Sequence, residues 1–396
     1  MRLDACPICK SKTIVDFLCR PSVPVHQNLV CCEETRARSI SRGRLEMVVC
    51  SCCGFTFNRS FDSSLLAYGT SYDNSQNHSP AFERHLEILV NRLLDQHGVR
   101  NCRIVEVGCG KGDFLRRLVK APGSTNRGIG MDPSYEGPAS AADGRLEFRR
   151  QFFDRNTRDV AADVVICRHV IEHIDQPVDF LRAIRQGLQN SPQARLFFET
   201  PCVSWILQNN VTWDFFYEHC SLFTRNSLTA AFERAGFDVV QVNHVFAGQY
   251  LWLEAVPAEQ PSANRLAGAD VVQQARDFGR SEAQRKLHWS RTAEQLKLRG
   301  NVAVWGAGAK GVTLANVIDP DRRLISCIVD INPNKQGNYL AGTGHPIVSP
   351  NRLREFNVKT AIVLNPNYGE EVAALTHDLG LDVSVIDLME WEQKAA

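Results

Sequence analysis

The chain has 396 residues, of which 44% are hydrophobic and 22% charged, proportions typical of soluble globular proteins. Its 45 basic and 44 acidic residues give a net charge of +1, which offers no electrostatic basis for binding nucleic acid or an anionic membrane. The sequence contains neither an apolar run near the roughly 20 residues of a membrane span nor a secretion signal at its start. We therefore expect a cytoplasmic protein of two or three domains.

Cysteines are concentrated at the beginning of the chain, where eight of the fourteen lie in the first 53 residues. In a reducing compartment such crowding indicates metal binding rather than disulfides. Cys6 and Cys9 form one C-x-x-C pair and Cys50 and Cys53 a second, so four thiolates can close a tetrahedral structural zinc site. A zinc ribbon of a nucleic-acid-modifying protein is an alternative, which the balanced charge disfavours.

A polar and aromatic segment follows at residues 65–80, with few residues that could form a core. Two tyrosines in such a segment favour a lid across a ligand pocket over a plain linker. Ser79 and Pro80 then predict the start of a helix over Ala81–His97, whose apolar positions repeat at helical spacing.

The segment from Ile104 to Leu115 reads as a strand, a sharp turn and the start of a helix. It contains the pattern E-x-G-x-G-x-G followed by an aspartate. Glycines in such a turn let a nucleotide approach the backbone more closely than a Cβ would allow, and flanking carboxylates favour a positively charged ligand over a pyrophosphate. The candidate cofactor-binding residues here are Glu106, Gly108, Gly110, Gly112 and Asp113.

The next predicted strand ends at Asp132, about 20 residues after the glycine turn, where a ribose diol is normally held. The motif together with this aspartate resembles the class I S-adenosylmethionine-dependent methyltransferases. The resemblance implies S-adenosylmethionine as the cofactor, and a dinucleotide site or a structural glycine turn is the alternative. Phe153, after the third strand, is a candidate wall for the adenine or else a core residue.

Strand and helix patterns alternate from residue 101 to about 255, as in a doubly wound parallel α/β sheet. Ligands in such folds bind at the carboxyl ends of the strands. The fourth strand runs into Arg168, His169 and His173, which makes Arg168 and His169 candidates for cofactor binding and His173 for catalysis, with helix capping or core packing as the alternative for the histidines.

After the fifth strand, an aromatic stretch over residues 213–224 places Glu218 next to His219. A glutamate beside a histidine in an apolar pocket can orient and poise a general base near neutral pH. Residues 259–299 then read as a helical connector with two helices, Ala263–Phe278 and Arg285–Leu298.

A second nucleotide-binding pattern, G-x-G-x-x-G at Gly306, Gly308 and Gly311, follows a predicted strand near the start of a C-terminal unit over residues 300–396. The pattern alone allows either an NAD-dependent oxidoreductase or close packing of a helix on a glycine turn. Lys310 within the turn indicates a nearby anion, such as a substrate phosphate.

The whole order of motifs resembles the three-domain C-methyltransferases of unusual sugars, which methylate a carbon next to a ketone on nucleotide-linked deoxysugars. The shared parts are the two C-x-x-C pairs, the E-x-G-x-G-x-G core, E-H-x-x-x-F from Glu218 to Phe223 and W-G-A-G-A-K-G from Trp305. The resemblance implies a zinc-binding domain with a lid over residues 1–78, a class I methyltransferase Rossmann-like domain over 79–258, and a C-terminal Rossmann-like domain that seats the substrate.

The same resemblance assigns His219 as the base, Glu218 as its partner, and His173 and Tyr72 as further residues that line the site. Phe216, followed by Tyr217, stands where the family commonly has a tyrosine. We therefore expect S-adenosylmethionine-dependent C-methylation of a small molecule. O- or N-methylation of another natural product and, from a different class, NAD-dependent oxidoreduction are the alternatives.

Overall fold

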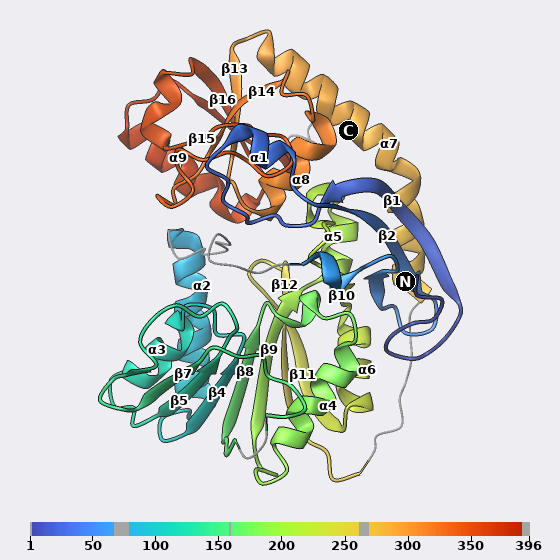
Figure 1. Cartoon of the computed structure of the whole chain (residues 1–396), viewed down its shortest axis with the longest axis vertical. Helices are drawn as coiled ribbons and strands as arrows, with labels where there is room; N and C mark the ends of the chain where they lie inside the picture. The colour runs from blue at the N-terminus through green and yellow to red at the C-terminus, as the bar shows by residue number, and fades with distance from the viewer. Residues whose placement is uncertain (1, 67–78, 158–159, 261–268, 390–396) are drawn as a thin grey trace.

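The fold is described from a computed structural model that covers residues 2–66, 79–157, 160–260 and 269–389. It contains three sheets, which Figure 1 shows as an N-terminal unit in blue, a central unit in cyan to yellow, and a C-terminal unit in orange and red. Every helix within those ranges is too short or too polar to cross a lipid bilayer.

The N-terminal sheet has four antiparallel strands in the order β1-β2-β3-β10. The strands are β1 (Ile14–Pro24), β2 (Arg42–Cys50), β3 (Thr56–Asn58) and β10 (Ser221–Leu222), and a short helix α1 (Glu34–Arg38) lies between β1 and β2. The strand β10 belongs to the central part of the chain, so this sheet joins two regions that are far apart in sequence.

The central sheet has eight strands in the order β11-β12-β9-β8-β4-β5-β7-β6. The run from β9 to β7 is parallel, whereas β12 is antiparallel to both of its neighbours. The bounds are β4 (Arg103–Val107), β5 (Arg127–Met131), β6 (Ser140–Ala141), β7 (Leu146–Arg149), β8 (Val164–Arg168), β9 (Arg195–Pro201), β11 (Phe237–Val245) and β12 (Tyr250–Pro257). This confirms the predicted doubly wound α/β fold.

Helices cover both faces of the central sheet because the strands are apolar on both sides. One core layer contains side chains of α2 (Pro80–Asn91) and α3 (Asp113–Lys120), and the other contains side chains of α4 (Pro177–Gly187) and α6 (Arg225–Arg234). The predicted start of α2 is confirmed, since the Ser79 hydroxyl accepts a hydrogen bond from the Phe82 N–H. A short helix α5 (Val203–Gln208) follows β9.

The C-terminal sheet is wholly parallel, with the order β15-β14-β13-β16-β17. Its elements are β13 (Asn301–Trp305), α8 (Ala309–Ile318), β14 (Ile325–Val329), β15 (Ile347–Val348), β16 (Val358–Val363), α9 (Gly369–Asp378) and β17 (Ser384–Asp387). The predicted Rossmann-like unit is therefore present, with the glycine pattern between β13 and α8.

The connector is one helix, α7 (Ala269–Lys297), so the prediction of two helices with a break after Phe278 is wrong. Gly279 falls where the break was expected. A Cβ at this position would lie 2.0 Å from the Phe17 carbonyl oxygen, so the glycine allows α7 to pack closely on β1 rather than ending the helix.

Candidate active site

The glycine turn between β4 and α3 places Gly108, Gly110 and Gly112 in the left-handed region, with φ of 70°, 52° and 80°. Two of these glycines also prevent clashes, because a Cβ at Gly108 would lie 2.2 Å from Val170 and one at Gly112 would lie 2.4 Å from Phe148. Gly110 has nothing within 4 Å of the position of a Cβ. The turn therefore leaves open space beside Gly110, where a ligand could approach the backbone.

Two carboxylates at this turn differ in their contacts. Asp132 accepts hydrogen bonds from the Gly110 N–H through Oδ2 and from the Ser134 N–H through Oδ1, both at 2.8 Å. Glu106 is buried, and its Oε2 has no hydrogen-bond partner among the residues that the structure describes. Burial raises the pKa of Glu106 to about 8, against the opposing effect of Arg168. An unpaired buried carboxylate oxygen beside a glycine turn fits a cationic ligand better than an anionic one.

Phe153, the candidate adenine wall, has the surroundings of its alternative, a core residue. Its ring is buried in the core layer beneath α4, so that a Cβ at Gly187 would lie 3.0 Å from the ring. The neighbouring Phe152 is 67% exposed. Asp113 is the first residue of α3, as the motif predicts.

A buried ionic cluster lies at the carboxyl ends of β8 and β9, centred on Glu199. Its Oε2 accepts a hydrogen bond from Arg168 Nε at 2.8 Å and lies 3.4 Å from His169 Nε2, and its Oε1 lies 2.5 Å from His85 Nε2. Burial would raise the pKa of Glu199, but Arg168 and His169 hold it well below its usual range. Arg168 also covers the Phe114 ring at 4.5 Å, which links the cluster to the start of α3.

His169 has a second carboxylate neighbour, Glu172, whose Oε1 lies 3.3 Å from His169 Nδ1. Burial alone would lower the pKa of His169, but Glu199 and Glu172 outweigh it and raise the pKa to about 9. His169 is therefore cationic at neutral pH. The ionic contacts of Arg168 and His169 are thus with Glu199 and Glu172, two acids that the sequence analysis did not select. Glu199 ends a predicted strand, and Glu172 follows the end of another by a few residues.

His219 is a half-buried imidazole on the wall of a cavity, beside other rings. Its ring centroid lies 4.0 Å from that of Phe216 and 4.9 Å from that of His173. Burial, followed by the effects of His173, His169 and Lys310, holds the pKa of His219 well below its usual 6.5. The ring is therefore neutral at neutral pH, the form that can accept a proton.

Glu218 does not pair with His219. The Glu218 carboxylate accepts a hydrogen bond from the Gln27 N–H at 2.8 Å and lies 3.6 Å from His26 Nδ1, and within the described ranges no hydrogen bond joins it to the His219 ring. The structure thus contradicts the predicted pair, because adjacent side chains leave the backbone in different directions. The carboxylate that lies near both His173 and His219 is Glu172.

Tyr217 also belongs to the N-terminal unit rather than to the site. Its hydroxyl accepts a hydrogen bond from the Asp62 N–H at 2.9 Å, and its ring lies against Gly43, where a Cβ would approach to 2.3 Å. Tyr217 therefore does not replace the hydroxyl that Phe216 lacks. Tyr72, predicted as a catalytic residue, lies outside the described residues, as does most of the predicted lid.

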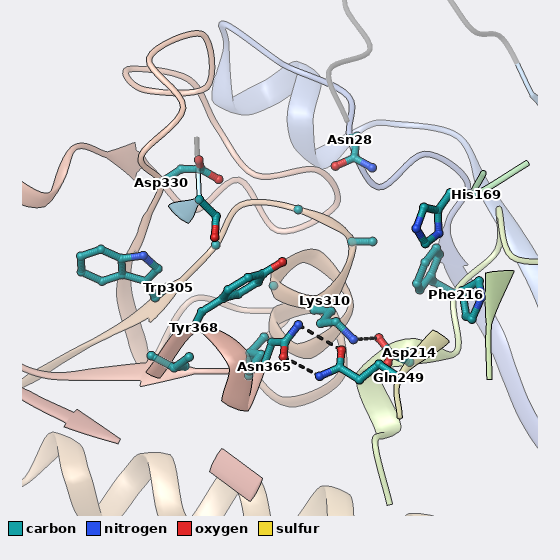
Figure 2. A pocket seen from close by; sticks show the side chains of 18 of the residues that line it. Asn28, His169, Asp214, Phe216, Gln249, Trp305, Lys310, Asp330, Asn365 and Tyr368 are labelled. Atoms are coloured by element: carbon teal, nitrogen blue, oxygen red, sulfur yellow. Dashed lines mark hydrogen bonds and ion pairs between the residues drawn. The ribbon is translucent and has the colours of Figure 1, made fainter. Parts of the chain in front are cut away.

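A cavity of about 290 Å³ separates the central and C-terminal units. Figure 2 shows His169 and Phe216 on one side of it and Trp305, Tyr368 and Asp330 on the other. The predicted catalytic histidines and the glycine pattern of the C-terminal unit share this cavity, whose lining includes His169, Glu172, His173, His219, Trp305, Gly306, Gly308, Lys310, Gly311 and Tyr368.

Two side-chain pairs cross between the units at this cavity. Gln249 and Asn365 exchange two amide hydrogen bonds, at 2.7 and 3.1 Å, and Lys310 forms an ion pair with Asp214 (Figure 2). These contacts fix the C-terminal unit over the carboxyl ends of β9 and its neighbours. The predicted anion near Lys310 is thus, in part, a carboxylate of the protein itself.

The four cysteines predicted to bind metal converge. The Cys6 and Cys53 sulfurs lie 3.6 Å apart, the Cys9 and Cys50 sulfurs lie 3.4 Å apart, and all four lie within 4.8 Å of one another. A tetrahedral site with Zn–S bonds of about 2.3 Å would space its sulfurs by about 3.8 Å. The donor set and the spacing therefore fit a structural zinc ion.

Comparisons with known proteins agree with this arrangement. A family described as a methyltransferase domain matches residues 80–242, and the C-methyltransferase C-terminal domain matches residues 258–380. The C-methyltransferase NovU of Streptomyces niveus is 26% identical over 390 residues, which cover 93% of this chain and 91% of that protein. The chain contains a methyltransferase domain followed by a C-methyltransferase C-terminal domain. It is therefore a methyltransferase, and the predicted resemblance is confirmed at the level of the family.

Other relatives match a smaller part of the chain. The mitochondrial ubiquinone biosynthesis O-methyltransferase of Schizosaccharomyces pombe is 30% identical over 111 residues, covering 26% of this chain and 40% of that protein. Among solved structures, the 1,6-didemethyltoxoflavin-N1-methyltransferase of Burkholderia thailandensis has a TM-score of 0.35 and 17% identity, covering 46% of this chain and 82% of that one. A likeness at this level adds no functional conclusion.

Proposed function

We propose that this methyltransferase uses S-adenosylmethionine to methylate a carbon next to a carbonyl group, on a nucleotide-linked deoxysugar or a related intermediate. The observation that carries the proposal is the neutral, half-buried His219 on the wall of a cavity that the methyltransferase unit shares with the C-terminal unit. A base at such a position can remove an acidic C–H proton from an acceptor that the other unit holds.

The glycine turn is the proposed donor site. S-adenosylmethionine, when bound, supplies an electrophilic methyl group on a sulfonium. The unpaired Glu106 oxygen would face the cationic end of the donor, the backbone at Gly110 would allow its close approach, and Asp132 would hold the ribose. Arg168 contributes to the charge balance at Glu106 and hydrogen-bonds Glu199, so it connects the donor end of the site to the acceptor end.

The proposed chemical role of the protein is deprotonation and positioning. His219 takes the acceptor proton, and His173, with its ring 4.9 Å away, lines the same end of the cavity. The cationic His169 in the same wall would favour the negative charge that develops on the acceptor when the proton leaves. Exclusion of water by the surrounding aromatic side chains strengthens this interaction.

The C-terminal unit is the proposed seat of the acceptor. The cavity reaches the start of α8 at Gly308 and Lys310, where a phosphate group of the acceptor would meet a helix N-terminus and a cation. Trp305 and Tyr368 also line the cavity, and the nucleobase of a nucleotide-linked acceptor could stack on their rings. NAD binding at this glycine pattern is the alternative that titration with NADH tests.

The test is proton exchange without methyl transfer. A nucleoside-diphosphate keto-deoxysugar would be incubated with the enzyme in heavy water without the methyl donor, and the C–H next to the carbonyl would be followed by NMR. We expect exchange with the unmodified enzyme and a loss of about 10²-fold or more in His219→Asn. Unchanged exchange and turnover in His219→Asn would overturn the assignment of the base.

A further inference from the structure

Three side chains at one end of the cavity converge more closely than the proposed reaction requires. Glu172 and His173 lie on a short 3-10 turn, Ile171–His173, and His219 lies just before β10. One ligand atom from each lies within 4.8 Å of the other two. Two imidazoles and a carboxylate make up a common ligand set for divalent first-row metals.

Both imidazoles are available as ligands. His173 Nδ1 is buried and has no hydrogen-bond partner within the described part of the chain. The His219 ring lies beside that of His173 and lines the cavity, where the lone pair of its neutral form can bind a metal. The two rings are nearly perpendicular, at 85°, and both line the cavity, so a metal between them would keep coordination positions open towards it.

The carboxylate is held in place by two neighbours. Glu172 Oε2 accepts a hydrogen bond from the Thr200 hydroxyl at 3.1 Å, and Oε1 lies 3.3 Å from His169 Nδ1. Contacts of this kind orient a metal ligand, and a carboxylate has about four lone-pair positions, so these two leave others for a metal.

The charges around the set are balanced rather than strongly attractive. The nearby cations are Lys310, which is paired with Asp214, and His169, which lies between Glu199 and Glu172. A dication would thus gain little from long-range attraction and would depend on direct ligation. The affinity should therefore fall sharply when one ligand is removed.

We propose that Glu172, His173 and His219 form a second metal site, separate from the four cysteines, that takes a borderline divalent cation such as Ni²⁺ or Zn²⁺ and so inhibits the enzyme. The inhibition rests on the proposed function, because the metal would occupy the His219 lone pair that accepts the substrate proton. The metal and the proton then compete for one nitrogen atom.

The binding arm of the test uses the full chain with its zinc-filled cysteine site and no substrate. Calorimetric titration with Ni²⁺ should show one further ion per chain. His173→Gln and Glu172→Gln should each weaken this binding by at least about ten-fold. His377→Gln, which changes a histidine that is 90% exposed, should leave it unchanged. No further ion, or an affinity in both ligand variants equal to that of the unmodified enzyme, would overturn the site. Zinc content after each titration shows whether the variants are folded and the cysteine site intact.

The activity arm separates this inference from the proposed function. Ni²⁺ should inhibit turnover over the same concentrations at which it binds, and a chelator should reverse the inhibition. Binding without inhibition would overturn the inhibitory role and the base assignment together, while the metal site would stand. Absence of binding in an enzyme that His219→Asn inactivates would overturn the metal site alone.

Discussion

Ser221, two residues after His219, pairs with Phe57, four residues after Cys53. The Cys220 carbonyl also accepts a hydrogen bond from the Asn58 N–H at 2.9 Å. The four cysteines hold the turn between β2 and β3, and β3 in turn holds the strand that follows the proposed base. The zinc-binding unit is therefore a support for the active site as well as a separate fold.

Loss of the metal should consequently reduce both stability and turnover. Cys53→Ser removes one of four ligands and should lower the melting temperature and abolish most of the methyl transfer, because β3 and the segment around His219 lose their support. Cys19→Ser, at an exposed cysteine outside the metal cluster, is the control and should change neither. Full activity in a zinc-free Cys53→Ser protein would contradict this role.

Glu218 should behave as a structural residue rather than as part of a catalytic pair. Glu218→Ala leaves the buried Gln27 N–H without its acceptor and should cost about 1–3 kcal/mol of unfolding free energy. Because Glu218→Gln can still accept this hydrogen bond, it should retain most of the stability and of the turnover. Urea denaturation and kcat measured on both variants check this. A large loss of kcat in Glu218→Gln with unchanged stability would restore the catalytic pair.

Binding of the methyl donor should release a proton near neutral pH. Because the pKa of Glu106 is about 8 in the protein alone, its carboxyl is mostly protonated at pH 7, and a cationic ligand would favour the ionised form. Donor affinity should therefore rise with pH, by up to about ten-fold per unit, until about pH 8. Calorimetry in buffers of different ionisation enthalpy measures the released proton, and Glu106→Gln should abolish it. Proton uptake on binding would contradict the assignment.

Lys310 should matter for the acceptor and not for the donor. Lys310→Met removes a cation from the wall of the cavity near the start of α8. We expect KM for a nucleoside-diphosphate sugar to rise by about ten-fold or more, since a charged hydrogen bond contributes roughly 1.5–3 kcal/mol, while donor affinity stays the same. The Asp214→Asn variant separates loss of the ion pair from loss of the cation. An unchanged KM in Lys310→Met would place the phosphates elsewhere.

The correct predictions from the sequence concern features that depend on local residue patterns and on the spacing of residues. The strands β4 and β7 have their predicted bounds, Ser79 caps α2, and the two C-x-x-C pairs converge. Each of these depends on residues close together in sequence or on a fixed ligand geometry.

The wrong predictions concern residues whose contacts are with residues far away in the sequence. Glu218 was predicted to pair with its neighbour His219 but contacts Gln27, almost 200 positions earlier. A helix was predicted to end at Phe278, but the helix continues and Gly279 lets it pack on β1. Glu172 and Glu199 were not selected because a buried acid at a strand end or on the turn after a strand carries no local motif. Their roles depend on His169, Arg168 and His85, which only the fold brings together.

The central claim is that the glycine turn after β4 binds a methyl donor and that the C-terminal glycine pattern does not bind NAD. Calorimetric titration of the purified protein with S-adenosylmethionine and, separately, with NADH tests it most directly. We expect micromolar binding of S-adenosylmethionine, weakened in Glu106→Gln, and no heat with NADH. Binding of NADH alone would contradict the account and would move the reaction to the C-terminal unit.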